Sequence, residues 1–93
     1  MRTIKYTGKF KVDYRREKSG RHSKKLDGFL KPIIDLLVED TPLPPNAVDH
    51  PLNGQRKDCR DCHIKPDLLL LNRKPDDDTL ELIRLGSHSE LGL

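Results

Sequence analysis

The chain has 93 residues, which allows one domain with a modest hydrophobic core. One third of the residues are hydrophobic and 35% are charged, and two cysteines are too few for a disulfide framework. No apolar run approaches the roughly 20 residues that span a membrane, and residues 1–6 lack the apolar core of a signal peptide. We therefore expect a cytoplasmic protein that forms a single domain over residues 1–93.

Positive charge gathers in the N-terminal third of the chain. The net charge is +3, but residues 1–31 hold eleven Lys/Arg against three Asp/Glu, whereas residues 32–93 hold seven against twelve. A basic block of this kind suits contact with phosphate groups or with an acidic partner, and a solvated face is the open alternative.

The N-terminal half predicts one strand followed by two helices. Residues 3–6 indicate a short strand, and a helix is expected from Thr7 or Gly8 to Ser19. A second helix, which Ser23 can cap, carries its apolar residues at three- and four-residue steps and so presents one broad apolar face.

A proline interrupts the second predicted helix. Pro32 has no backbone N–H and leaves the Gly28 carbonyl without its donor, so a kink or a break is expected there. Residues 41–46 contain three prolines and predict a stiff connector that is neither helix nor central strand. Residues 50–54 then indicate a loop that ends in a turn.

The C-terminal half predicts three short strands, at residues 59–64, 67–72 and 79–85. The turns between them, at residues 65–66 and 74–78, are short enough for antiparallel pairing. The three consecutive aspartates of the second turn are expected to be a solvated hairpin tip. The predicted fold is α+β, with an N-terminal strand and two helices packed on an antiparallel sheet.

Titratable side chains that suit RNA cleavage gather in this half. Asp61 and His63 lie two residues apart, so in a strand they share a face while Cys62 points into the core. Asp67 follows just across a turn, and a central last strand would bring His88 near the others. A lone surface histidine usually has no role, so spacing alone leaves this site a hypothesis.

RNA cleavage needs a base for the ribose 2′-hydroxyl, an acid for the leaving 5′-oxygen and positive charge near the phosphorane. Histidine titrates near neutral pH and can act as base or acid, and a neighbouring carboxylate can hold its tautomer. Arg84 can donate a fork of hydrogen bonds to phosphate oxygens.

A competing motif overlaps these residues. Residues 59–63 fit C-x-x-C-H, the haem attachment pattern, but attachment requires export, and Met1 is the only methionine. Zinc on Cys59, Cys62 and a histidine stays open, although a second pair of ligands at regular spacing is missing. A redox pair would need a helix after the first cysteine, and otherwise Cys62 is a small core residue.

Three ordered segments carry a resemblance to a known family. Residues 49–54, Asp-His-Pro-Leu-Asn-Gly, followed by residues 60–67, Arg-Asp-Cys-His-Ile-Lys-Pro-Asp, resemble the YafQ branch of the RelE-superfamily toxins. The end, residues 84–91, is similar to the closing motif of the same family. The resemblance is strong over residues 42–91 and compatible over residues 1–41.

The resemblance implies a small RelE-like fold and a ribosome-dependent endoribonuclease. Such a toxin cleaves mRNA in the ribosomal A site by acid–base catalysis, without metal or other cofactor, and stops translation. Its implied partners are the ribosome with its mRNA and a cognate antitoxin of the DinJ/RelB type, acidic and partly disordered. Operator DNA is expected to be bound only through that antitoxin.

The resemblance also assigns roles to individual residues. Acid–base work and phosphate stabilisation are expected of His50, His63, Asp67 and His88, and Asp61 is expected to orient its neighbours. Which histidine is base and which is acid stays open. The expected RNA contacts are Arg60, Lys65 and Arg84.

The chain departs from the family pattern at aromatic positions, which motivates an alternative function. It has Asn72 where the family usually has Tyr, Leu68 where some relatives have Trp, and Gly92-Leu93 where Phe often follows the last histidine. An aromatic side chain can stack on a base of the RNA, so its loss would weaken the positioning of the substrate. The second hypothesis is therefore a catalytically weakened toxin that acts mainly as an antitoxin-binding co-repressor. The third is a small zinc-binding module.

Overall fold

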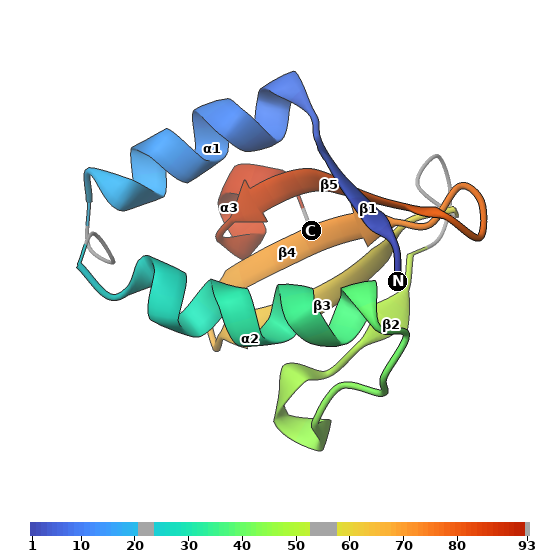
Figure 1. Ribbon diagram of the computed structural model, residues 1–93. Helices are drawn as coiled ribbons and strands as arrows, with labels where there is room; N and C mark the ends of the chain where they lie inside the picture. Colours follow the sequence, from blue (N-terminus) through green and yellow to red (C-terminus); the bar gives the residue numbers. More distant parts are fainter. Residues whose placement is uncertain (21–23, 53–57, 93) are drawn as a thin grey trace.

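A five-stranded mixed sheet forms the centre of the protein in the computed structural model, which describes residues 1–20, 24–52 and 58–92 (Figure 1). The strand order is β1-β5-β4-β3-β2, with β1 parallel to β5 and the other neighbours antiparallel. The strands are β1 (Thr3–Tyr6), β2 (His50–Pro51), β3 (Arg60–Lys65), β4 (Leu68–Arg73) and β5 (Thr79–Gly86). The predicted α+β class is confirmed, and the parallel β1 makes the sheet mixed where an antiparallel sheet was expected.

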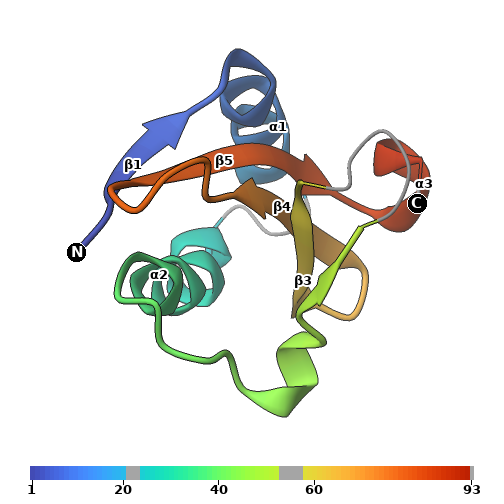
Figure 2. The same cartoon turned by 90° about the vertical axis from the view of Figure 1, so that its right-hand side faces the viewer.

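Helices cover both faces of this sheet. They are α1 (Gly8–Lys18), α2 (Leu26–Val38) and α3 (His88–Leu91), with a 3-10 helix, η1 (Pro45–Ala47). Figure 2 shows α2 and α3 on opposite sides of the sheet. In the described part of the chain, no helix is long and apolar enough to cross a membrane.

The central strand β4 is buried on both faces by four consecutive leucines. Leu68 and Leu70 belong to the larger core, which the sheet forms with α1 and α2. Leu69 and Leu71 point the other way and form a smaller cluster with Leu91 of α3. Because both faces are covered, β4 is a continuous apolar run and not an alternating pattern.

Helix α1 closes the part of the β5 edge that β1 leaves open. The Thr7 hydroxyl donates to the carbonyl of Leu82 at 3.0 Å, where the pairing with β1 ends. Further along β5, the carboxylate of Asp13 accepts from the Leu85 N–H at 3.0 Å, and Arg16 donates to the Leu85 carbonyl at 2.8 Å. Side chains of α1 thus satisfy backbone groups that a neighbouring strand would otherwise pair.

Asp13 is the charged centre of this contact and is only 2% exposed. Arg84 donates to its carboxylate through Nε at 2.6 Å and Nη2 at 3.2 Å, and Arg16 donates through Nη1 at 3.0 Å. Burial alone would raise the pKa of Asp13, but the hydrogen bonds from Arg84 and the Leu85 N–H outweigh it and hold the pKa below its ordinary value.

The two long helices follow the sequence prediction except at the proline. Helix α1 has the predicted bounds, with Thr7 as N-cap and Ser19 as C-cap. Helix α2 continues through Pro32, so the expected break is wrong. Gly28 and Pro32 both lie on the exposed face of α2, where water can satisfy the carbonyl that lost its donor. The predicted cap, Ser23, lies outside the described residues.

The connector and the loop before β3 contain more regular structure than predicted. Residues 45–47 form η1, which begins inside the stretch expected to exclude helix, because a proline at the first position of a helical turn needs no N–H donor. His50-Pro51, expected in a loop, form the short edge strand β2. The bounds of β3, β4 and β5 differ from the predicted ones by one residue at one or both ends, as is usual for strand ends.

We predict that Asp13→Asn lowers the free energy of unfolding by about 2–3 kcal/mol at pH 7, because it leaves the partly buried guanidinium of Arg84 without its counter-charge. Urea denaturation measures this. Since the folded-state pKa of Asp13 is lowered, its stabilisation is present above the unfolded pKa and is lost as the pH falls through the folded pKa.

The matched control is Asp35→Asn, which removes a carboxylate from the exposed ion pair with Lys31. This change should alter stability by no more than about 0.5 kcal/mol. Equal losses in the two variants would contradict a structural role for the buried carboxylate.

Candidate active site

Strand β3 places two of the predicted catalytic side chains on one face of the sheet. Asp61 and His63 pair with Leu71 and Leu69, which belong to the smaller cluster on the α3 side. Cys62 points the opposite way and lies in the larger core. The predicted alternation, with Asp61 and His63 on one face and Cys62 on the other, is confirmed.

All five predicted catalytic residues meet on this face. His50 of β2 lies opposite Asp61, with Nε2 and Oδ2 3.3 Å apart. The ring of His88, at the start of α3, lies edge-on to the ring of His63 with the centroids 5.4 Å apart. Asp67, in the turn between β3 and β4, brings Oδ1 to 3.3 Å from Nδ1 of His88. The cluster therefore contains two histidine–carboxylate pairs, with His63 between them.

The two carboxylates differ in their surroundings. Asp61 is 3% exposed, and burial raises its pKa although positive charge on His50, His63 or His88 would act in the opposite direction. Its Oδ1 is buried and has no hydrogen-bond partner among the described residues. The side chain of Asp67, by contrast, is 65% exposed. Among the described residues, the site thus places a buried carboxylate oxygen without a hydrogen-bond partner beside histidine side chains, whose ring nitrogens can bind protons.

A capping box fixes the helix that carries His88. The Ser87 hydroxyl accepts from the Glu90 N–H, and the Glu90 carboxylate accepts from the Ser87 N–H at 2.9 Å. The other Glu90 oxygen lies 3.2 Å from Nε of Arg16 on α1. A Cβ at Gly86 would lie 2.9 Å from Nη2 of that arginine and 3.2 Å from the Glu90 carboxylate, so a larger residue there would displace the end of the arginine side chain. Sequence reasoning missed this support, although the Ser-x-x-Glu spacing is a recognisable capping signal.

Each of the three cations predicted to contact RNA has another side chain as its partner. Arg84 forms the buried ion pair described above. Arg60 donates to Asp49 at 3.0 Å, and the Lys65 ammonium lies 3.9 Å from the ring centroid of Phe29 on α2. Their role as RNA contacts stays a prediction.

Part of the cluster has the composition and spacing of a metal site. His50, Asp61 and His63 each offer one ligand atom, and these atoms lie within 4.8 Å of one another. Two imidazole nitrogens and a carboxylate oxygen suit a divalent transition metal. Among the described residues, Cys59 and Cys62 belong to no such group, and burial raises the pKa of the Cys62 thiol to about 12. The alternative zinc site on the two cysteines is therefore not supported.

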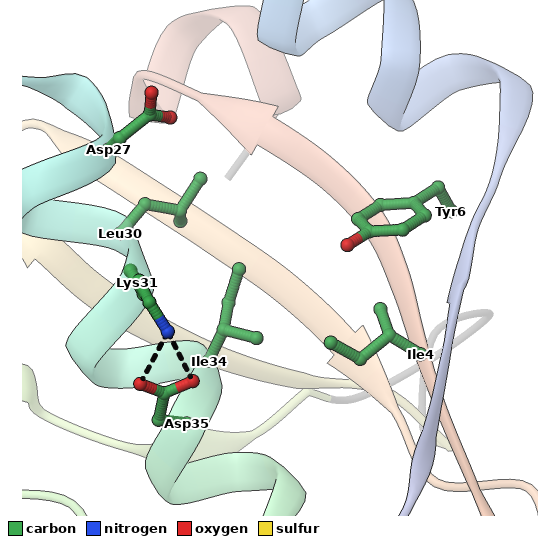
Figure 3. A pocket seen from close by; sticks show the side chains of 7 residues that line it. All are labelled: Ile4, Tyr6, Asp27, Leu30, Lys31, Ile34 and Asp35. Carbon is green, nitrogen blue, oxygen red and sulfur yellow. Dashed lines mark hydrogen bonds and ion pairs between the residues drawn. The ribbon is translucent and has the colours of Figure 1, made fainter.

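A separate hollow of about 430 Å³ lies at the opposite edge of the sheet, between β1 and α2 (Figure 3). Apolar side chains of both elements face it, and the Lys31–Asp35 ion pair lies at its rim. Its lining residues are Ile4, Tyr6, Asp27, Leu30, Lys31, Ile34 and Asp35. Its described lining residues include no histidine, whereas the cluster on the α3 side contains three.

Comparison with known proteins gives similar sequences and similar structures from one family. The model of the family described as "Bacterial toxin of type II toxin-antitoxin system, YafQ" matches residues 2–92. The mRNA interferase toxin YafQ of Escherichia coli K12 is 38% identical over 91 residues, which cover 97% of this chain and 95% of that protein.

Two solved structures are similar over nearly their whole length. The toxin in the E. coli DinJ–YafQ complex is 34% identical with a TM-score of 0.83, covering 98% of both chains. A metal-bound toxin from Helicobacter pylori is 41% identical with a TM-score of 0.80, covering 98% of this chain and 99% of that one.

We predict that Asp61→Asn stabilises the fold at pH 7. Burial raises the folded-state pKa of Asp61, so its contribution to stability is fully present below the unfolded pKa and is lost as the pH rises through the folded pKa. The gain of the variant in urea denaturation should therefore shrink as the pH is lowered below about 4, the ordinary aspartate pKa.

Asp67→Asn serves as the control, because the same substitution there removes an exposed carboxylate. It should give no gain at pH 7. A loss of stability in Asp61→Asn at that pH would show that the buried charge is satisfied in the fold.

Proposed function

The chain belongs to the YafQ family of bacterial toxins from type II toxin–antitoxin systems, and on this basis we propose that it is an mRNA interferase. It cleaves mRNA in the A site of the ribosome and thereby stops translation. The observation that carries the proposal is the convergence of three histidines and two aspartates on one face of the sheet.

The two histidine–carboxylate pairs suit the two proton transfers of RNA cleavage. One imidazole takes the proton of the ribose 2′-hydroxyl while the 2′-oxygen bonds to phosphorus. A second imidazole, protonated, gives its proton to the 5′-oxygen as the P–O5′ bond breaks. The products are a 2′,3′-cyclic phosphate and a 5′-hydroxyl. His50 with Asp61 and His88 with Asp67 provide these groups, and His63 between them donates to the phosphorane oxygens.

The basic N-terminal third suits the ribosome as the place of action. Its eleven Lys/Arg give residues 1–31 a strongly positive charge, which favours the phosphates of ribosomal RNA and speeds association. Of the three cations predicted to contact mRNA, Arg84 is oriented by Asp13, so it meets a phosphate in a fixed position. We place this activity in the cytoplasm.

The proposed partner is an acidic antitoxin of the DinJ type. The E. coli relative is solved in complex with DinJ. An acidic, partly disordered segment that orders on contact would complement the basic charge of this chain. Through that antitoxin the toxin would also reach operator DNA.

A second function, metal binding, is favoured by a specific observation. The ligand atoms of His50, Asp61 and His63 lie close enough to share one ion, and the Asp61 Oδ1 has no other partner among the described residues. A bound metal would neutralise the buried carboxylate and occupy lone pairs of two histidines. We propose that copper(II) or zinc binds here and inhibits cleavage, because acid–base catalysis needs those lone pairs.

Replacing either His63 or His88 by Ala should restore growth to cells that express the chain without an antitoxin. Loss of a general acid or base lowers cleavage by about 10²–10⁴-fold. Primer extension on mRNA after induction measures cleavage and its codon positions. His22→Ala, at the remaining histidine, is the control and should leave toxicity intact. Unchanged toxicity in both site variants would count decisively against the assignment.

The same assay separates the toxin from the co-repressor alternative. A weakened homologue would leave growth and mRNA intact even when the unaltered chain is induced alone. Cleavage that respects the reading frame would establish that the ribosome presents the substrate.

Stripping the purified protein of metal before the assay should leave the cleavage rate unchanged, whereas one equivalent of zinc or copper(II) should slow it. Titration calorimetry should give one ion per chain, and His63→Ala should weaken that binding by at least tenfold because it removes one of three ligands. The cleavage rate is measured with purified protein and programmed ribosomes. Loss of cleavage by the metal-stripped protein, on ribosomes kept in magnesium, would overturn metal-independent catalysis.

A further inference from the structure

A hollow of about 540 Å³ lies directly beside the histidine cluster. Among the described residues, strand β2 pairs only with Asp61 and Arg60, and no strand pairs with the rest of β3 on that side. Figure 2 shows η1, in light green at the bottom of the view, close to the end of β3 where the chain turns into β4. The lining residues are Asn46, Val48, His63, Ile64, Lys65 and Pro66. His63 is thus shared by this hollow and by the proposed catalytic site.

The backbone of Val48 is strained in a way that its packing does not explain. Its φ of 49° and ψ of 51° are left-handed, a conformation that β-branched residues rarely adopt. The turn itself is needed, because it ends η1 and returns the chain to pair His50 with Asp61. Glycine or asparagine would make the same turn at lower cost. The valine side chain is 51% exposed, so core packing gives no reason for it.

The preceding residue shows that η1 is anchored without Val48. Ala47 is 2% exposed and packs η1 onto the protein, and the Val48 N–H closes the turn by donating to the Pro45 carbonyl at 3.1 Å. Strained backbone conformations are typical of functional sites. A strained, exposed valine beside His63 therefore indicates that its side chain contacts a ligand. The ligand must lie where the valine methyl groups point, within the lining of the hollow.

The lining matches the surface of a nucleobase. Val48, Ile64 and Pro66 offer apolar contact to its flat faces. Asn46 carries a carboxamide, which can donate to and accept from a base edge. Lys65 adds positive charge, held beside the hollow by the ring of Phe29. Single-stranded RNA is recognised in this way, with a base turned out and its edge hydrogen-bonded.

We propose that this hollow binds the nucleobase next to the scissile phosphodiester, with Val48 against its face and Asn46 at its edge. The proposal rests on the proposed ribonuclease function and adds to it a subsite that determines which sequences are cut. Because His63 lines both places, a base seated in the hollow holds the adjoining phosphate at the catalytic cluster.

The test combines changes in the protein with changes in the RNA. Ribosomes are programmed with a synthetic mRNA whose A-site codon is intact or lacks the base on the 5′ or the 3′ side of the cleaved bond. The unaltered protein should cleave one of the two abasic substrates about tenfold more slowly or worse, the scale of a lost base contact. Val48→Asn keeps the left-handed turn and removes the apolar face. On intact mRNA this variant should cleave more slowly than the unaltered protein by a similar factor. On that abasic substrate the variant and the unaltered protein should cleave at the same rate.

Two further variants complete the test. Val12→Asn makes the same change at a valine on α1 that is 59% exposed, and it should cleave like the unaltered protein. Asn46→Ala should change the ratio of cleavage among codons that differ in the bound base. The thermal midpoint of Val48→Asn should equal or exceed that of the unaltered protein, because asparagine tolerates the left-handed backbone.

The outcomes distinguish this subsite from the proposed function. Absence of cleavage by the unaltered protein overturns both. Normal cleavage with independent effects of Val48→Asn and of base removal overturns the subsite alone. A thermal midpoint lowered by several degrees in Val48→Asn also overturns it, because the valine would then serve the fold.

Discussion

The alternation of side chains along β3, fixed by its pairing with β4, is the constraint on which the site depends. A register shift of one residue would turn His63 toward the leucine core and Cys62 toward the histidines. The leucines of β4 prevent such a shift, because Leu70 must face the larger core opposite Cys62 while Leu69 faces the α3 side opposite His63. A bulge then interrupts the alternation, and Lys65 lies over Phe29 on the other face.

Features set by local pattern could be predicted, and features set by distant contacts could not. The shared face of Asp61 and His63 follows from a period of two, which any strand imposes. The pairing of His50 with Asp61 depends on a left-handed valine, which no propensity favours. The burial of Asp13 within a basic helix depends on the edge of β5, which lies some 70 residues away in sequence. These contacts carry no local signal because they depend on how elements that are separate in the sequence meet in the fold.

Stability and the proposed chemistry use different parts of the molecule. The leucine core and the charged contacts of α1 hold the sheet together, and the capping box of Ser87 with Glu90 extends that rigidity to α3. The site contains the costly features instead, namely a buried carboxylate oxygen without a partner among the described residues and a strained turn at Val48. Such costs persist where the surrounding structure enforces them, and they are typical of functional sites.

The two histidine–carboxylate pairs of the proposed site differ in the burial of their carboxylates. Asp61 is shielded from water, so its charge acts strongly on an imidazolium at His50. Asp67 is exposed, so solvent screens its effect on His88. The two imidazoles themselves are equally accessible, since the side chain of His50 is 45% exposed and that of His88 is 46% exposed. The asymmetry of the proposed site therefore lies in its two carboxylates and not in the access of the histidines to water.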